Sequence, residues 1–496
     1  MITTIIVPFD YKEFQCIDTA CTDSCCAGWQ VDVDDYSFAY YKGIEGKFGE
    51  KLRSVMVEIP GEEGQFRLCE NGDCPFLRED KLCEMFAEIG EAGLCDTCTN
   101  YPRFIEDYGE VREMGIAFSC PEAARLMLSK KEPMEYVQIS IAPTKSFCPE
   151  VSSIQERSVS FKNAAFLPMH RNTPDGYDLK QEEWTKVAQD VLWRTRFMGA
   201  EETGQLTENG EAGQQEYIIH SEESFDEDYF QMLKDCRSVA FYIVQNRELK
   251  VSQRVLLYLD YARAVQELLD HEPICEESDE QSRNRLKEGM KECNKQYLTT
   301  GFLKERVKQL VQEMEQTPED DRGYDLYGEP VAKGELSYHL MPEYMAVLYQ
   351  ELKHCKPQWG PMLEEAEQLL HTQMDAQTYD ALYQEFQEYY QSKEYEYEHL
   401  LSYFVFKYFL KAYFDDDIYG KAKVGVMGYL VVTELAVCQW LKQGKTYTTE
   451  DQAELFHLYS REMEHSEENY DAFYEALQTE DFCNWEHLKL LLCERL

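Results

Sequence analysis

Ten of the eighteen cysteines in this chain of 496 residues lie close together, between residues 16 and 120. They are Cys16, Cys21, Cys25, Cys26, Cys69, Cys74, Cys83, Cys95, Cys98 and Cys120. Thiols at this density usually bind a metal or form a framework of disulfides. Chain size, the presence or absence of an export signal, and cysteine spacing decide between these two chemistries.

A disulfide framework fits this chain poorly. Residues 1–9 contain no basic region and no apolar core of secretory length, and Pro8 interrupts the segment early. The chain is also much larger than the small secreted domains that depend on disulfides. We therefore expect a cytoplasmic protein whose cysteines are reduced and available to bind a metal.

The metal centre predicted by these cysteines must be rich in thiolates. All ten histidines lie at or beyond His170, so the first 120 residues can add only a carboxylate. Zinc sites usually pair two C-x2-C units, and this segment has one, from Cys95 to Cys98. Iron–sulfur clusters accept more varied spacing. The spacing favours an iron–sulfur cluster and leaves zinc or mononuclear iron as alternatives.

Composition narrows the partners. The formal net charge of −45 repels a phosphate backbone, which argues against nucleic acid. The longest apolar run, residues 424–441, contains Glu434 and two glycines, so it predicts a buried helix and not a transmembrane segment. Peripheral attachment to a membrane and oligomerisation stay open.

Hydrophobic patterning predicts a mainly α protein. Residues 1–150 form an irregular, cysteine-rich, metal-binding domain, with a short strand at residues 2–9 and a helix starting after Pro121. From residue 181 to 496 we expect a larger, all-helical domain, because apolar residues recur every three or four positions, as at Val255, Leu259 and Ala262.

Four blocks of sequence, in the same order, resemble the flagellin lysine N-methylase family. They are FQCIDTACTDSCCAGWQVDVD at 14–34, NGDCPFLREDKLCEMFAEIG at 71–90, LCDTCTNYPR at 94–103 and SCPEAARLML at 119–128. The same blocks resemble small zinc- or iron-chelating cysteine-cluster domains. The resemblance covers roughly the first 130 residues, and the helical remainder is compatible with it.

The resemblance implies methyl transfer from S-adenosylmethionine to the ε-amine of flagellin lysines, dependent on a [4Fe-4S] cluster. The cysteines at matching positions are Cys16, Cys21, Cys25, Cys26, Cys74, Cys83, Cys98 and Cys120. One cluster takes four thiolates, and we expect Cys21, Cys25 and Cys26 to supply most of them. Arg103 also matches, and we expect it to face the cofactor carboxylate; the alternative is an arginine that stabilises a tight turn.

This chemistry requires a base that the sequence does not single out. A lysine amine, with a usual pKa of about 10.4, must lose its proton before it attacks a methyl sulfonium. There is no glycine-rich strand-to-helix turn, so S-adenosylmethionine binding rests on the resemblance, and the C-x3-C-x2-C spacing of radical enzymes is absent. The alternative function is a non-catalytic zinc- or iron-binding interaction protein.

Overall fold

The chain divides into two units in the structure, a computed structural model. It describes residues 2–59, 64–140, 166–168, 181–195, 225–271, 280–317, 331, 334–350 and 352–496. The first unit, here called the sheet unit, contains Met1–Ala123 and Glu135–Asp226. The second, the helical unit, contains Ala124–Met134 and Glu227–Leu496. Most of the predicted domain boundary between 150 and 181 lies outside the described residues.

Helices build the second unit, as the sequence predicted. They are α7 (Glu227–Val244), α8 (Val251–His271), α9 (Glu280–Tyr297), α10 (Thr300–Gln316), α11 (Leu336–Met345), α12 (Trp359–Ala366), α13 (Ala376–Tyr390), α14 (Glu394–Tyr408), α15 (Ala412–Asp415), α16 (Ile418–Lys442), α17 (Thr449–Glu464), α18 (Glu467–Thr479) and α19 (Trp485–Glu494). The apolar positions Val255, Leu259 and Ala262 are fully buried on α8. The predicted mainly α fold is confirmed.

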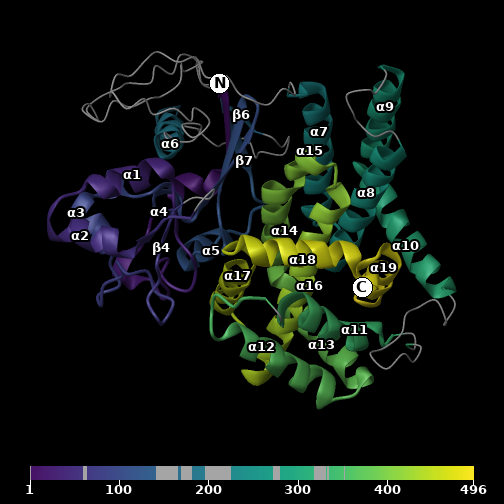
Figure 1. Cartoon of the computed structure of the whole chain (residues 1–496). Helices are drawn as coiled ribbons and strands as arrows, with labels where there is room; N and C mark the ends of the chain where they lie inside the picture. Colours follow the sequence, from purple (N-terminus) through teal and green to yellow (C-terminus); the bar gives the residue numbers. More distant parts are fainter. Residues whose placement is uncertain are drawn as a thin grey trace. The chain divides into compact units, whose positions relative to one another are not determined.

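Helix α16 lies at the centre of the helical unit and packs against α8, α12, α14, α17 and α18 (Figure 1). It begins after Asp417, whose carboxylate accepts a hydrogen bond from the Gly420 N–H at 2.7 Å, an N-cap that satisfies an otherwise unpaired donor. Among the described residues, α16 alone has the length and apolar composition to cross a membrane, and 89% of its most apolar window is buried inside the protein. Such burial is typical of a core helix.

A charged residue, Glu434, is fully buried on α16. Its carboxylate lies 2.9 Å from His371 Nε2 and accepts hydrogen bonds from the Tyr379 hydroxyl at 2.8 Å and from Arg495 at 2.9 Å. These partners come from a π-helical turn at Glu367–Thr372, from α13 and from the C-terminal end of the chain. One carboxylate therefore joins three separate segments to the central helix.

The sheet unit contains more regular structure than the sequence predicted. Its elements are β1 (Thr4–Pro8), β2 (Asp32–Val33), α1 (Asp35–Gly43), α2 (Gly46–Val55), β3 (Met56–Val57), β4 (Gly64–Phe66), α3 (Glu84–Ile89), α4 (Asp96–Asn100), β5 (Arg103–Tyr108), β6 (Val111–Ile116), β7 (Tyr136–Ser140), β8 (Phe166–Pro168) and α6 (Gln181–Arg194). Five strands form one sheet in the order β5-β6-β1-β7-β8. The predicted strand at residues 2–9 is its middle strand, and the other four were not predicted.

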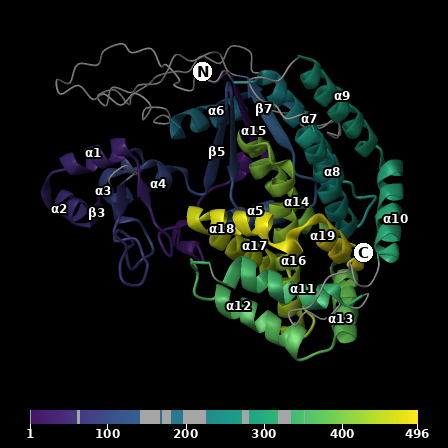
Figure 2. The ribbon, with the colours of Figure 1, turned by 45° about the vertical axis from the view of Figure 1, so that its right-hand side comes forward.

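The cysteine-bearing loops lie with α1 to α4 to one side of the five-stranded sheet (Figure 2). A small second sheet, in the order β2-β4-β3, lies within this part. The hairpin from β5 to β6 turns at Gly109, whose φ of +59° favours glycine. Because β5 starts at Arg103, the sheet fixes the position of the segment that precedes it, Tyr101 and Pro102.

Helix α6 packs in the sheet unit, whereas the sequence predicted that the helical domain starts at residue 181. The Tyr11 hydroxyl donates a hydrogen bond to Asp190 at 2.9 Å, and the Arg194 guanidinium donates one to the Thr99 carbonyl at 2.5 Å. Its helical periodicity resembles that of the later helices. Periodicity identifies a helix but not the partner it packs against.

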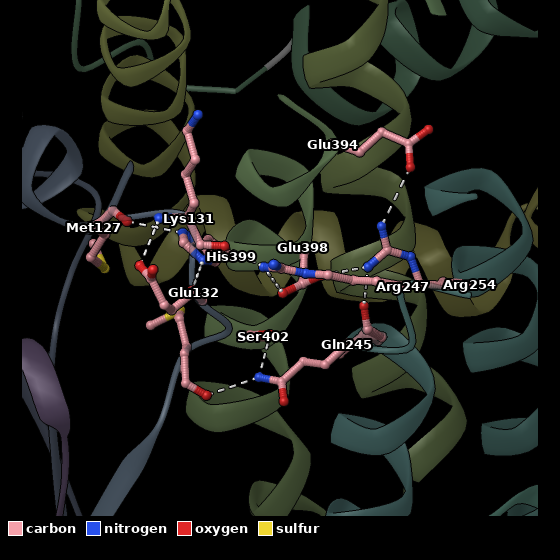
Figure 3. A network of polar contacts seen from close by, with 12 residues as sticks. Met127, Lys131, Glu132, Gln245, Arg247, Arg254, Glu394, Glu398, His399 and Ser402 are labelled. Atoms are coloured by element: carbon pink, nitrogen blue, oxygen red, sulfur yellow. Dashed lines mark hydrogen bonds and ion pairs between the residues drawn. The ribbon is translucent and has the colours of Figure 1, made fainter. Parts of the chain in front are cut away.

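Residues 124–134 belong to the helical unit because side chains of its helices hold their backbone (Figure 3). The ring nitrogens of His399 on α14 lie 2.9 Å from the Met127 carbonyl and 2.8 Å from the Glu132 carbonyl. Carbonyl oxygens only accept hydrogen bonds, so the imidazolium form makes both contacts together. Gln245 donates to the Met134 carbonyl at 2.9 Å. The segment includes the end of α5 (Pro121–Leu128), the helix predicted after Pro121.

Replacing Glu434 by glutamine should lower the free energy of unfolding of the helical unit by about 3 to 5 kcal/mol, because the buried Arg495 loses its counter-charge. Urea unfolding followed by far-UV circular dichroism measures this. The matched control is Glu365→Gln, which removes an exposed pair with Lys442 at 2.5 Å and should cost less than about 1 kcal/mol. Equal losses in the two variants would contradict a central role for Glu434.

The contribution of Glu434 should disappear in acid. Burial alone would raise its pKa, but the hydrogen bond from His371 and the charge of Arg495 lower it from 4.5 to about 2. A carboxyl group whose pKa is depressed on folding stabilises the fold above its unfolded pKa and loses this effect as the pH falls toward its folded pKa. The difference in unfolding free energy between the natural protein and Glu434→Gln should therefore narrow by about 2 kcal/mol between about pH 6 and about pH 3.

Candidate functional site

All eight predicted metal ligands lie in the sheet unit, and every cysteine that the structure describes is a free thiol. They sit on loops and at the ends of short elements. Cys16 and Cys21 flank a 3₁₀ turn at Asp18–Ala20, and Cys83 immediately precedes α3. Such positions leave the backbone free to bend, which the crowded spacing of these cysteines requires.

Five thiols share one apolar core, and we call them the inner thiols: Cys26, Cys74, Cys83, Cys95 and Cys98. Their neighbours in this core include Tyr41, Phe66, Phe76 and Met85. The Cys74 N–H donates to the Cys26 carbonyl at 2.8 Å, which joins the first cysteine block to the second. The sequence blocks at 14–34, 71–90 and 94–103 thus meet in one place.

The inner thiols hydrogen-bond one another. The Cys26 thiol lowers the pKa of Cys83 to about 6, helped by the backbone N–H groups of Phe86 and Met85, although burial opposes this. The pKa of Cys98 is raised by its hydrogen bond with Cys95 and then by burial. Thiolates this close repel one another, so all of them can be ionised together only beside a cation.

Four other thiols form a separate group, the outer thiols: Cys16, Cys21, Cys25 and Cys120. Burial raises the pKa of Cys16, and the nearby thiols of Cys25 and Cys21 raise it further. Burial also raises the pKa of Cys120 to about 12, with added effects from Cys21 and Cys16. Cys16 and Cys25 are exposed, whereas Cys120 is buried.

Residues 101–103 hold the outer thiols together. The Trp29 indole donates to the Cys25 carbonyl at 2.8 Å, and its ring lies 5.9 Å from the Tyr101 ring. The Tyr101 hydroxyl donates to the Ser119 carbonyl at 2.7 Å, next to Cys120. These contacts bring the segment around Cys25 to the segment around Cys120, across almost a hundred residues of sequence.

Arg103 packs against two aromatic rings. Its guanidinium carbon lies 5.4 Å from the Tyr11 ring centroid and 5.3 Å from that of Phe14, and its Nε donates to the Tyr11 hydroxyl at 2.9 Å. These contacts place the chain just before Cys16 beside the same 101–103 segment. They suit a packing role, and the predicted contact with the cofactor carboxylate stays a prediction.

The donor chemistry of both groups fits a thiolate-bound metal. Among the described residues, no three His, Cys, Asp or Glu side chains lie close enough together to hold one metal ion. A [4Fe-4S] cluster binds one thiolate on each of four irons, so its thiolates stand further apart than those around a single ion. Gathered but well-separated thiols, without histidine, therefore suit the cluster better than a mononuclear site.

Two features of the site were not foreseen. Cys95, which the family resemblance set aside, is fully buried among the inner thiols. Its C-x2-C spacing with Cys98 was the signal for this. The sequence also grouped Cys21, Cys25 and Cys26, but in the structure Cys26 lies with the inner thiols and the other two with the outer ones. Cys69, also set aside, is exposed.

A family model described as "FliB lysine N-methylase C-terminal domain" matches residues 237–491, more than half of the chain. The chain is also 26% identical over 136 residues to the flagellar biosynthetic protein FliU of Salmonella muenchen, which covers 26% of this chain and 80% of that protein. The lysine-N-methylases of Salmonella typhimurium and Salmonella choleraesuis show the same identity over 34% of their length. The chain thus spans about a third of these two relatives. No solved structure matches it.

The match of the family model covers most of the helical unit, and the four cysteine blocks that resemble the same family lie in the first 130 residues. The two resemblances therefore come from different parts of the chain and agree. The chain belongs to the family of FliB lysine N-methylases, which are methyltransferases.

Proposed function

We propose that this protein transfers methyl groups from S-adenosylmethionine to lysine side chains of flagellin, and that it depends on an iron–sulfur cluster held by cysteines of the sheet unit. The family match over residues 237–491 carries the proposal. The names of the relatives, a flagellar biosynthetic protein and lysine-N-methylases, support the class of substrate. The cluster and the cofactor follow from the cysteine blocks and the gathered thiols.

The reaction itself is a displacement at carbon. The lone pair of the lysine nitrogen forms a bond to the methyl carbon, the carbon–sulfur bond breaks, and S-adenosylhomocysteine leaves with that electron pair. The proton of the amine passes to a base. When bound, the cluster supplies an iron that can take an amino or carboxylate group as a ligand. The cysteines would hold it at the side of the five-stranded sheet.

The alternative is a metal site that only stabilises the sheet unit, and the apolar packing of the inner thiols favours it. The two functions separate in an assay with anaerobically purified protein and S-adenosylmethionine labelled in its methyl group. We expect a brown protein that transfers label to flagellin. Cys98→Ser should lose at least about tenfold of this transfer, a barrier increase of about 1.4 kcal/mol or more.

The matched control is Cys69→Ser, since Cys69 is exposed and is not a predicted ligand. It should keep both colour and transfer. A colourless protein loaded with zinc, with no transfer to flagellin, would remove the proposed function and leave the structural one.

The predicted role of Arg103 is tested by Arg103→Lys. Lysine keeps the positive charge near the rings of Tyr11 and Phe14 but cannot form the two parallel hydrogen bonds that an arginine makes to a carboxylate. We expect the Kd for S-adenosylmethionine to rise about tenfold, measured by equilibrium dialysis. Arg78→Lys, at an exposed arginine paired with Asp80 at 2.6 Å, serves as the control. An unchanged Kd with a lowered Tm would assign Arg103 to packing alone.

A further inference from the structure

The eight motif-matching cysteines divide four and four in the structure. Cys26, Cys74, Cys83 and Cys98 are inner thiols in one apolar core. Cys16, Cys21, Cys25 and Cys120 are the outer thiols, and none of them belongs to that core. A [4Fe-4S] cluster or a structural zinc ion takes four thiolates, so each set has the number of donors that one centre needs.

The division falls between two neighbours in the sequence, Cys25 and Cys26. Their sulfur atoms are 4.0 Å apart, but the two residues are held from different sides. The Cys25 carbonyl accepts the hydrogen bond from Trp29, whose ring meets Tyr101. The Cys26 carbonyl accepts the one from the Cys74 N–H. The backbone bends at this pair, and each thiol joins a different group.

Each group also has its own support. Apolar side chains surround the inner thiols, and the isolated β-bridges Ala27↔Asp73 and Leu77↔Cys83 connect their loops. The outer thiols depend on residues 101–103, which Phe14, Trp29 and Ser119 contact from three segments. Because separate contacts position the two groups, loss of one need not displace the other.

We propose that the sheet unit holds two thiolate-bound metal centres, an inner one on Cys26, Cys74, Cys83 and Cys98 and an outer one on Cys16, Cys21, Cys25 and Cys120. This rests on the proposed function only in taking the cysteines as metal ligands. Each centre is an iron–sulfur cluster or a zinc ion, and each thiol releases its proton as the metal binds. Cys95 packs beside the inner centre as a fifth thiol, and the outer centre, with two exposed cysteines, is the more accessible.

The neighbouring substitutions Cys25→Ser and Cys26→Ser test this division. Iron, acid-labile sulfide and zinc are measured per protein chain after anaerobic purification, which tells clusters from zinc. We expect two centres in the natural protein and one in each variant. Cys25→Ser and Cys120→Ser should keep the same remaining centre, whereas Cys26→Ser and Cys98→Ser should keep the other one, recognised by its metal content or electron paramagnetic resonance spectrum. Cys69→Ser should keep both.

A single centre in the natural protein, or the same residual metal in Cys25→Ser and Cys26→Ser, overturns the proposal. Far-UV circular dichroism checks that each variant folds, and the exposed Cys16 and Cys25 provide two outer variants that disturb little packing. The methyl-transfer assay is read separately. Two centres without transfer would overturn the proposed function alone, and transfer with one centre would overturn the two-centre proposal alone.

Discussion

The carboxylate of Glu434 keeps its charge inside the helical unit because His371, Tyr379 and Arg495 all contact it. A buried charge without such partners costs several kcal/mol, so the segments that carry them have no freedom to pack elsewhere. The central helix α16 is otherwise almost wholly apolar and offers little to orient its neighbours. The ionic contacts at Glu434 therefore specify how the C-terminal end and α13 dock onto a helix that could accept many apolar partners.

The sheet unit faces the same constraint with a different answer. Its inner thiols lie in an apolar core, and the first 169 residues contain no histidine that could stay neutral and share a proton. Hydrogen bonds between thiols, such as that of Cys26 with Cys83, allow part of the set to ionise while the rest stays protonated. Full ionisation requires a cation, so metal binding and the stability of this small core are linked. A protein-only network neutralises the charge in one unit, whereas a bound metal would do so in the other.

Sequence patterns were sufficient where the structure depends on neighbours along the chain. The periodicity of α8 and the start of α5 after Pro121 are local, and both were predicted correctly. The sheet was missed because β1 pairs with β6, more than a hundred residues later, and because charged residues in β5 and β6 obscure the alternation of apolar positions. In the site, the cysteine types and the absence of histidine predicted thiolate chemistry. The opposite surroundings of Cys25 and Cys26 could not be predicted, since the contacts of Trp29 and Cys74 create them.

The two regions that resemble the family are continuous through one helix. Helix α5 begins directly after Cys120, an outer thiol, and ends at Leu128, within the segment whose Met127 carbonyl contacts His399 on α14. A rigid helix of eight residues therefore connects a candidate metal ligand to the backbone segment that the helical unit holds (Figure 3). A change at Cys120 on metal binding has only this short path to the residues matched by the methylase family model. Since helices transmit displacement with little loss, the outer thiols are better placed than the inner ones to affect the helical unit.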